Sequence, residues 1–206
     1  QPQTYEQWTA WGAVAKDGTA GKIQRLGINL GAPGDRVTHD GTLWVDYPSV
    51  GGPSPEIEMV VQPANVKNFY NHSLWIEGGK GWPWVAASGM EGVQSITLKG
   101  VKPGDYSVRL VFVEPESKKV GERVFDVSLQ GKAVLKGFDV IKEAKGRMRA
   151  VTKTQSKVSV GDDGQLLVEL KAKTGTSILS GIELIRDGLK ADEPLVLKDK
   201  VTTPLR

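Results

Sequence analysis

The strongest constraint on the fold is a two-residue alternation of apolar and polar side chains in the second half of the sequence. The alternating apolar residues are Tyr106, Val108, Leu110 and Phe112 in one segment, and Phe125, Val127 and Leu129 in the next. Successive side chains of a β-strand point to opposite faces, so this period places each set on one buried face. We therefore expect two strands that bury these residues in a common core.

Similar segments recur along the chain and are joined by turn sequences such as KPGD, QGK and GDDG. A helical turn or two is expected only within 140–150, and residues 142–157 hold six lysines or arginines in a strand-to-strand connection. Short strands separated by turns predict an all-β, antiparallel sandwich. The expected strands cover 22–30, 42–47, 57–61, 73–77, 93–100, 105–114, 122–130, 132–140, 157–160, 165–172 and 177–185.

The sandwich is expected to span residues 22–187. Residues 1–21 are interpreted as a lead-in that packs on the sandwich, and residues 188–206, which are charged and contain two prolines, as an extended tail. A chain of 206 residues is long enough for one such domain with a full core.

Composition excludes several classes of function. The chain has no cysteine and only two histidines, which argues against disulfides, thiolate chemistry and histidine-rich metal centres. Its net charge of +3 is too small and scattered to indicate nucleic-acid binding. No apolar run approaches the roughly 18 residues of a membrane span. No cofactor motif is present, and neither nucleic acid nor membrane is an expected partner.

The second half resembles the malectin and malectin-like family. The resemblance rests on a strand ending at Phe112 and Glu114, the strand Arg123 to Val127, a Gln130-Gly131 turn and a Phe138-Asp139 pair. It covers roughly 22–187 and is most specific from 104 to 140. It implies a jelly-roll β-sandwich like galactose-binding domains, carbohydrate binding without catalysis, and a place as an accessory module in secreted bacterial proteins. A secreted, periplasmic or cell-surface location follows from it.

The family resemblance also points to three loops that carry ligand contacts. One is the loop after Glu114, which reads PESKKVGE here and has no aromatic residue. Another lies near Gly175. The third precedes the strand at 93, and it alone has an aromatic counterpart here, in the region of Trp82 and Trp84.

The most prominent aromatic residues are Trp82 and Trp84, which flank a proline in a glycine-rich stretch. A flat indole can stack on the apolar face of a sugar ring, although either residue could instead pack in the core. Tyr70 and His72 add an amphipathic ring and an imidazole suited to hydroxyl groups. Trp75 is expected on a strand, with its side chain buried in the core of the sandwich.

Two polar residues, Asn29 and Asp46, lie near strand ends and complete the expected ligand-binding set. The loop between them carries Asp35, His39 and Asp40. Such a loop could hold structural calcium, but it lacks the ligand spacing of a calcium loop, so a solvated loop is favoured.

Catalysis is not expected. Glu114 and Asp126 are the carboxylates considered as a glycosidase pair, because they lie on successive strands of an expected hairpin that could bring them close. Arg123 is expected to neutralise one of them. The sequence therefore predicts a carbohydrate-binding module that recognises an oligo- or polysaccharide. The alternative is a structural sandwich that packs on a neighbouring domain of its parent protein without binding sugar.

Overall fold

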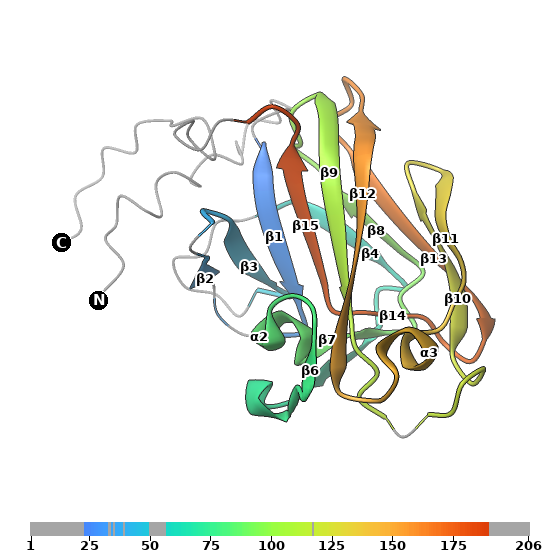
Figure 1. Ribbon diagram of the computed structural model, residues 1–206. Helices are drawn as coiled ribbons and strands as arrows, with labels where there is room; N and C mark the ends of the chain where they lie inside the picture. The colour runs from blue at the N-terminus through green and yellow to red at the C-terminus, as the bar shows by residue number, and fades with distance from the viewer. Residues whose placement is uncertain are drawn as a thin grey trace.

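The computed structural model describes residues 23–189, except for 33, 35, 39, 50–56 and 117. Within this part the chain forms two main β-sheets that face each other, with a smaller sheet and three short helices at one end (Figure 1). The expected all-β sandwich is thus confirmed. The expected lead-in at 1–21 and residues 190–206 of the expected tail lie outside the described residues.

One layer is a seven-stranded sheet. Its order is β2 (Arg36–Val37), β3 (Leu43–Tyr47), β1 (Arg25–Leu30), β15 (Gly181–Arg186), β9 (Gly104–Phe112), β12 (Arg149–Val160) and β6 (Gly78–Gly79). The β1–β3 and β12–β6 pairs are parallel and the others antiparallel.

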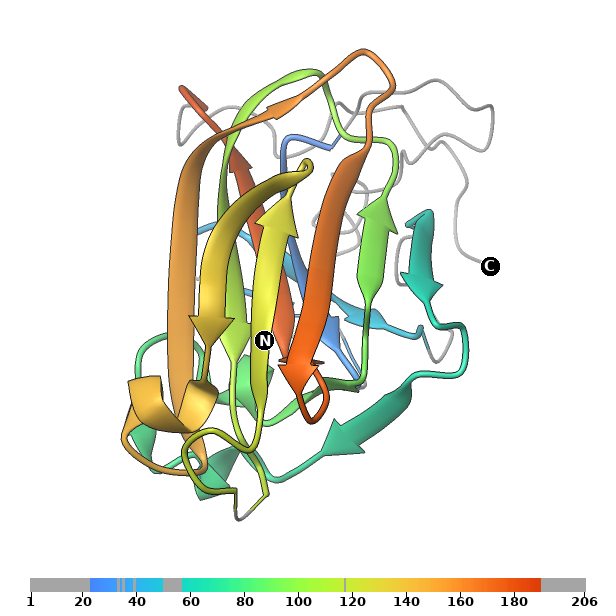
Figure 2. The same cartoon turned by 90° about the vertical axis from the view of Figure 1, so that its right-hand side faces the viewer.

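The second layer is a five-stranded antiparallel sheet, which runs across the front of Figure 2. Its order is β11 (Lys132–Phe138), β10 (Val124–Leu129), β13 (Leu166–Thr174), β8 (Ser95–Leu98) and β4 (Met59–Gln62). A three-stranded sheet of β14 (Ile178–Leu179), β7 (Ser88–Glu91) and β5 (Lys67–Tyr70) lies at the end of the sandwich. The helices are η1 (Ser73–Trp75), α2 (Pro83–Ala86) and α3 (Val140–Ala144).

Three phenylalanines hold the layers together. Phe112 of the first sheet lies 6.0 Å from Phe125 and 4.8 Å from Phe138 of the second, measured between ring centroids. Phe112 and Phe125 are fully buried. The expected burial of Phe112, Phe125, Val127 and Leu129 is confirmed, because all four side chains point between the sheets.

The prediction for 142–157 as a strand-to-strand connection is wrong. The expected helical turn is present as α3, where the Asp139 carboxylate caps the amide of Lys142 and Lys145 ends the helix in a left-handed conformation. After it, β12 begins at Arg149, eight residues before the expected strand. The polar residues of β12 form a strand because they pair in antiparallel register with β9, from Val151 to Val160.

Candidate functional site

The chain from 70 to 87 forms an excursion at one end of the sandwich, which we call the end segment. It leaves β5 at Tyr70, forms η1, adds β6 to the edge of β12, and returns through α2 to β7 (Figure 1). The amides of Glu77 and Lys80 donate to the carbonyls of Met148 and Ala150. Four of the six predicted ligand-binding residues, Tyr70, His72, Trp82 and Trp84, lie on this segment.

The end segment carries an exposed apolar surface. Tyr70, Leu74 and Trp75 are 64%, 84% and 60% exposed, and in the described part of the chain only two other large hydrophobic residues are exposed. A pocket of about 500 Å³ opens beside them. It is lined by Asn71, Leu74, Trp75, Glu77, Pro115, Arg147 and Met148. An exposed indole beside amide, carboxylate and guanidinium groups suits a ligand with both apolar and hydroxyl-bearing faces.

The expectation that Trp75 lies in the core of a strand is wrong. The imidazole Nδ1 of His72 accepts a hydrogen bond from the amide of Leu74 at 3.2 Å, and this cap starts the helical turn η1. A turn has no two-residue alternation, so Trp75 does not point inward as its apolar neighbours suggested. The signal that sequence reasoning missed is the Asn71-His72-Ser73 run, whose side chains favour caps and turns over strands.

Trp82 and Trp84 are neither fully buried nor freely exposed. Both are half-buried, and their ring centroids lie 6.2 Å apart. Trp84 meets the buried ring of Trp44 edge-on at 5.7 Å, and the guanidinium of Arg36 lies 5.1 Å from the Trp84 ring. These rings thus pack against a second apolar cluster on the outer face of the seven-stranded sheet, and each remains partly exposed.

Trp44 can lie flat on the sheet because the neighbouring strands carry glycine. A β-carbon at Gly27 would come within 2.1 Å of the Trp44 ring, and one at Gly181 within 3.2 Å of it and 2.4 Å of Val85. The two glycines therefore leave a depression that the indole fills, and α2 closes over it.

The structure places Asn29 and Asp46 side by side on β1 and β3, but both are buried. The hydroxyl of Ser88 donates to Asn29 Oδ1 at 3.2 Å, and the amide of Gly34 donates to Asp46 Oδ2 at 3.2 Å. The two side chains thus form hydrogen bonds within the protein, beneath the return of the end segment into β7.

The loop considered for calcium is described only in part. Asp35 and His39 lie outside the described residues. Asp40 accepts from the hydroxyl of Thr38 and, at 3.4 Å, from the amide of Thr42, which is the local turn chemistry that the sequence favoured. Among the described residues no group of three or more carboxylate or imidazole side chains could hold a metal ion.

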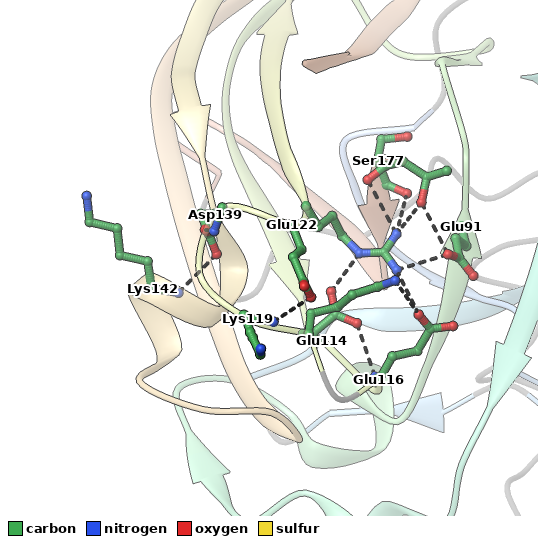
Figure 3. A network of polar contacts seen from close by, with 12 residues as sticks. Glu91, Glu114, Glu116, Lys119, Glu122, Asp139, Lys142 and Ser177 are labelled. Atoms are coloured by element: carbon green, nitrogen blue, oxygen red, sulfur yellow. Dashed lines mark hydrogen bonds and ion pairs between the residues drawn. The ribbon is translucent and has the colours of Figure 1, made fainter. Parts of the chain in front are cut away.

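The loops after Glu114 and around Gly175 converge on one guanidinium (Figure 3). Arg123 Nε donates to Glu114 Oε2 at 2.6 Å, and both side chains are buried. The same guanidinium reaches Glu91 at 2.9 Å, Glu116 at 3.5 Å and the carbonyl of Ser177 at 3.4 Å. Arg123 therefore links two of the loops to which the family resemblance assigns ligand contacts, through an ion pair to Glu116 and a hydrogen bond to the carbonyl of Ser177.

The pKa values of Glu91 and Glu114 are shifted in opposite directions, because burial dominates at Glu114 and the hydrogen bonds and ion pairs dominate at Glu91. Burial raises the pKa of Glu91, but hydrogen bonds from Lys67 and Arg123 outweigh it and lower that pKa to about 2. Burial raises the pKa of Glu114, against the opposing charge of Arg123. The expected neutralisation of a carboxylate by Arg123 is confirmed for Glu114.

The carboxylate pair considered for catalysis does not form a hairpin pair. Glu114 follows β9 of one sheet, whereas Asp126 lies in β10 of the other. Asp126 accepts from the amide of Gly137 at 2.7 Å and pairs with Lys173 at 2.9 Å. Each carboxylate thus has its own structural partners.

Comparison with solved structures defines the class of the domain. A calcium-binding mutant of Bacteroides uniformis beta-glucuronidase 2 superposes with a TM-score of 0.62 at 18% identity, over 85% of this chain and 19% of that chain. The plant receptor-like kinase FER superposes with a TM-score of 0.57 at 15% identity, over 79% of this chain and 42% of that chain. The structure of FER in complex with the plant peptide RALF23 and LLG2 superposes with a TM-score of 0.54 at 18% identity, over 82% of this chain and 53% of that chain. The fold is that of galactose-binding-like β-sandwich domains.

The family comparison is more specific. Residues 94–191 match the family model described as malectin domain. Over 56 residues the chain is 41% identical to a probable LRR receptor-like serine/threonine-protein kinase of Arabidopsis thaliana. The aligned stretch covers 24% of this chain and 6% of that protein. The malectin resemblance is thereby confirmed. In the part of the chain that the structure describes, no helix is long and apolar enough to cross a membrane.

Proposed function

We propose that this domain binds carbohydrate without catalysing its conversion, and that the end segment supplies the binding surface. The observation that carries the proposal is the exposed indole of Trp75 beside a pocket with polar groups from Asn71, Glu77 and Arg147. The malectin match of residues 94–191 supports carbohydrate as the ligand class. The separate structural pairing of Glu114 and Asp126 supports a role without catalysis.

In this proposal a sugar ring stacks on Trp75, and Tyr70 and the half-buried pair Trp82 and Trp84 extend the aromatic surface. His72 contributes mainly by capping η1, which fixes the direction of Trp75. Asn29 and Asp46 support the segment from below through Ser88 and the neighbouring loop. We further propose that the domain is an extracellular module of a larger secreted protein, of the bacterial kind that the sequence suggested. The chain covers 19% to 53% of the three similar solved structures and 6% of the Arabidopsis receptor-like kinase, which supports the modular arrangement.

Titration calorimetry with soluble polysaccharides tests the proposal on the wild type and on Trp75→Ala, Trp82→Ala and Trp84→Ala. A shallow site with a few stacking contacts should give a Kd between micromolar and millimolar. Trp75→Ala should weaken binding about tenfold, and Trp82→Ala and Trp84→Ala less. Val60→Ala, a partly exposed position on the opposite sheet, is the matched control. Wild-type affinity in all three tryptophan variants, with folding intact, contradicts the proposed surface.

A second function is favoured by Leu74, whose side chain is 84% exposed beside Trp75. An aliphatic side chain adds little to sugar stacking but suits contact with a protein. FER, one of the similar proteins, is found in a complex with a peptide and a partner protein. If no polysaccharide binds the wild type, a role in packing on a neighbouring domain or protein through Leu74 replaces carbohydrate binding.

A further inference from the structure

The two main sheets do not close on each other along β11 and β12. β11 is the last strand of the five-stranded sheet, and β12 pairs with β6 only at Arg149 and Ala150. Beyond Ala150, the edge of β12 that faces away from β9 has no strand partner among the described residues. The two strands pass side by side at this border of the sandwich (Figure 2).

A second pocket, of about 390 Å³, opens between these strands. It is lined by Leu129, Gln130, Lys132, Ala133 and Val134 of the β10–β11 hairpin and by Gln155, Lys157, Val158 and Ser159 of β12. Its floor belongs to the core, since Leu129 and Val158 are 2% and 5% exposed. The volume lies within the range of small-molecule sites, roughly 300–1,000 Å³.

This pocket is remote from the end segment. Residues 155–159 of β12 pair with 105–108 of β9, whereas Val151, next to the end segment, pairs with Phe112 at the other end of the same strand. The proposed carbohydrate surface therefore does not include it.

The walls of the pocket are held in place by a single amide. Gln130 Nε2 donates to the carbonyls of Ser159 and Gln165, both at 3.0 Å, and Gln130 Oε1 accepts from the amide of Leu167 at 2.7 Å. These bonds tie the hairpin to β12 and β13.

The backbone at the rim is also unusual. Lys157 has a left-handed φ of 57°, at a bulge where the register of β12 against β9 shifts between Gln155 and Val158. A non-glycine residue adopts this conformation at a cost, and bulges redirect side chains beside functional sites. The bulge places Lys157 at the opening of the pocket.

The charge at the opening has one sign. Lys132 and Lys157 line it, no acidic residue does, and within the described residues neither lysine forms an ion pair. An apolar floor under two ammonium groups complements a ligand that joins an aliphatic chain to an anionic head.

We propose that this pocket is a second ligand site, which binds an aliphatic carboxylate. The chain lies over Leu129, Val134 and Val158, and the carboxylate lies between the ammonium groups of Lys132 and Lys157. The site is independent of the proposed carbohydrate function, because it shares no lining residue with the end-segment pocket.

The test uses sodium octanoate, with 1-octanol and acetate as probes that keep only the chain or only the charge. Methyl resonances of Val134 and Val158 are followed by NMR during each titration. Octanoate should shift the methyl resonances of both residues until the shifts saturate, and it should bind at least tenfold more tightly than octanol or acetate. The double variant Lys132→Gln and Lys157→Gln should weaken octanoate about tenfold and leave octanol unchanged.

Two further variants complete the design. Ala133→Phe, at an exposed strand position, should fill the pocket and abolish the methyl shifts. Lys136→Gln, on the same strand but outside the lining, should bind octanoate like the wild type. Octanol binding as tightly as octanoate, shifts confined to other methyl groups, or full affinity in the double lysine variant overturns the proposal. Polysaccharide binding is unaffected in all these outcomes, so failure here leaves the carbohydrate proposal standing.

Discussion

Arg123 and Glu114 form a buried ion pair, with Nε and Oε2 2.6 Å apart and the side chains 2% and 0% exposed. The pair joins the start of β10 to the end of β9, so it links the two sheets of the sandwich. Its guanidinium also fixes the loops at Glu91 and Ser177.

Replacing Arg123 with methionine should destabilise the domain by about 3–5 kcal/mol, because Glu114 is left as a buried charge without its partner. Urea denaturation measures the loss. The double variant Arg123→Met with Glu114→Gln should recover a substantial part of it, since no unpaired charge remains. A loss under about 1 kcal/mol for Arg123→Met contradicts the importance of the pair.

The low pKa of Glu91 predicts a dependence of stability on pH. Its pKa is about 2 in the folded chain and ordinarily 4.5, so the folded state favours the charged form. The resulting stabilisation is present above about pH 4.5 and is lost as the pH falls towards 2. Glu91 is partly solvated, so we expect about 1–2 kcal/mol after screening.

Thermal unfolding of the wild type and Glu91→Gln between pH 7 and 2.5 checks this. The difference in the free energy of unfolding should shrink as the pH falls through this window. Glu114 acts in the opposite direction, because its pKa is raised in the folded state. Because Glu114 is present in both proteins, its contribution cancels in the difference between the wild type and Glu91→Gln. A constant difference over the whole range argues against the assignment.

Phe125→Ala should cost about 3–5 kcal/mol in the free energy of unfolding, through lost apolar burial and the cavity left behind. The ring is fully buried between Phe112, at 6.0 Å, and Phe138, at 5.6 Å. Denaturant titration is the measurement, and Val60→Ala on the outer face is the control. An effect no larger than that of the control is incompatible with this packing.

Gly27→Ala should destabilise the domain by about 1–3 kcal/mol, because the added methyl group collides with the ring of Trp44. In a Trp44→Leu background the same change should cost less, since the smaller side chain leaves room. Gly161→Ala, whose new methyl group would lie 3.6 Å from Asp163, should have little effect. Equal costs in both backgrounds would remove the collision as the cause.

The strands of the second half were predictable from sequence because their outer faces are polar and their inner faces apolar. β10, with Phe125 and Val127 inward, is the clearest case. β12 was recognised only at its last four residues. Its middle, TKTQS, is polar on both faces, and Thr154 to Ser156 are exposed. Its strand character therefore comes from pairing with β9 and does not show in the local pattern.

The site was less predictable than the fold. Sequence reasoning selected the end segment through Tyr70, His72, Trp82 and Trp84, but assigned its most exposed indole, Trp75, to the core. An apolar pair such as Leu74-Trp75 has the same local pattern in a buried strand and on an exposed turn. The cap from His72 distinguishes the two, and its trace in the sequence is the short polar run Asn71-His72-Ser73.

The length of β12 has a consequence for how the two proposed sites relate. Met148, which lines the end-segment pocket, directly precedes this strand, and Lys157 lies nine residues further on, near its other end. At about 3.3 Å per residue the separation exceeds 20 Å, more than two Debye lengths at physiological ionic strength. Charge at one site is therefore screened from the other, and the part of the chain that runs from one site to the other is β12, which is hydrogen-bonded to β9 along most of its length.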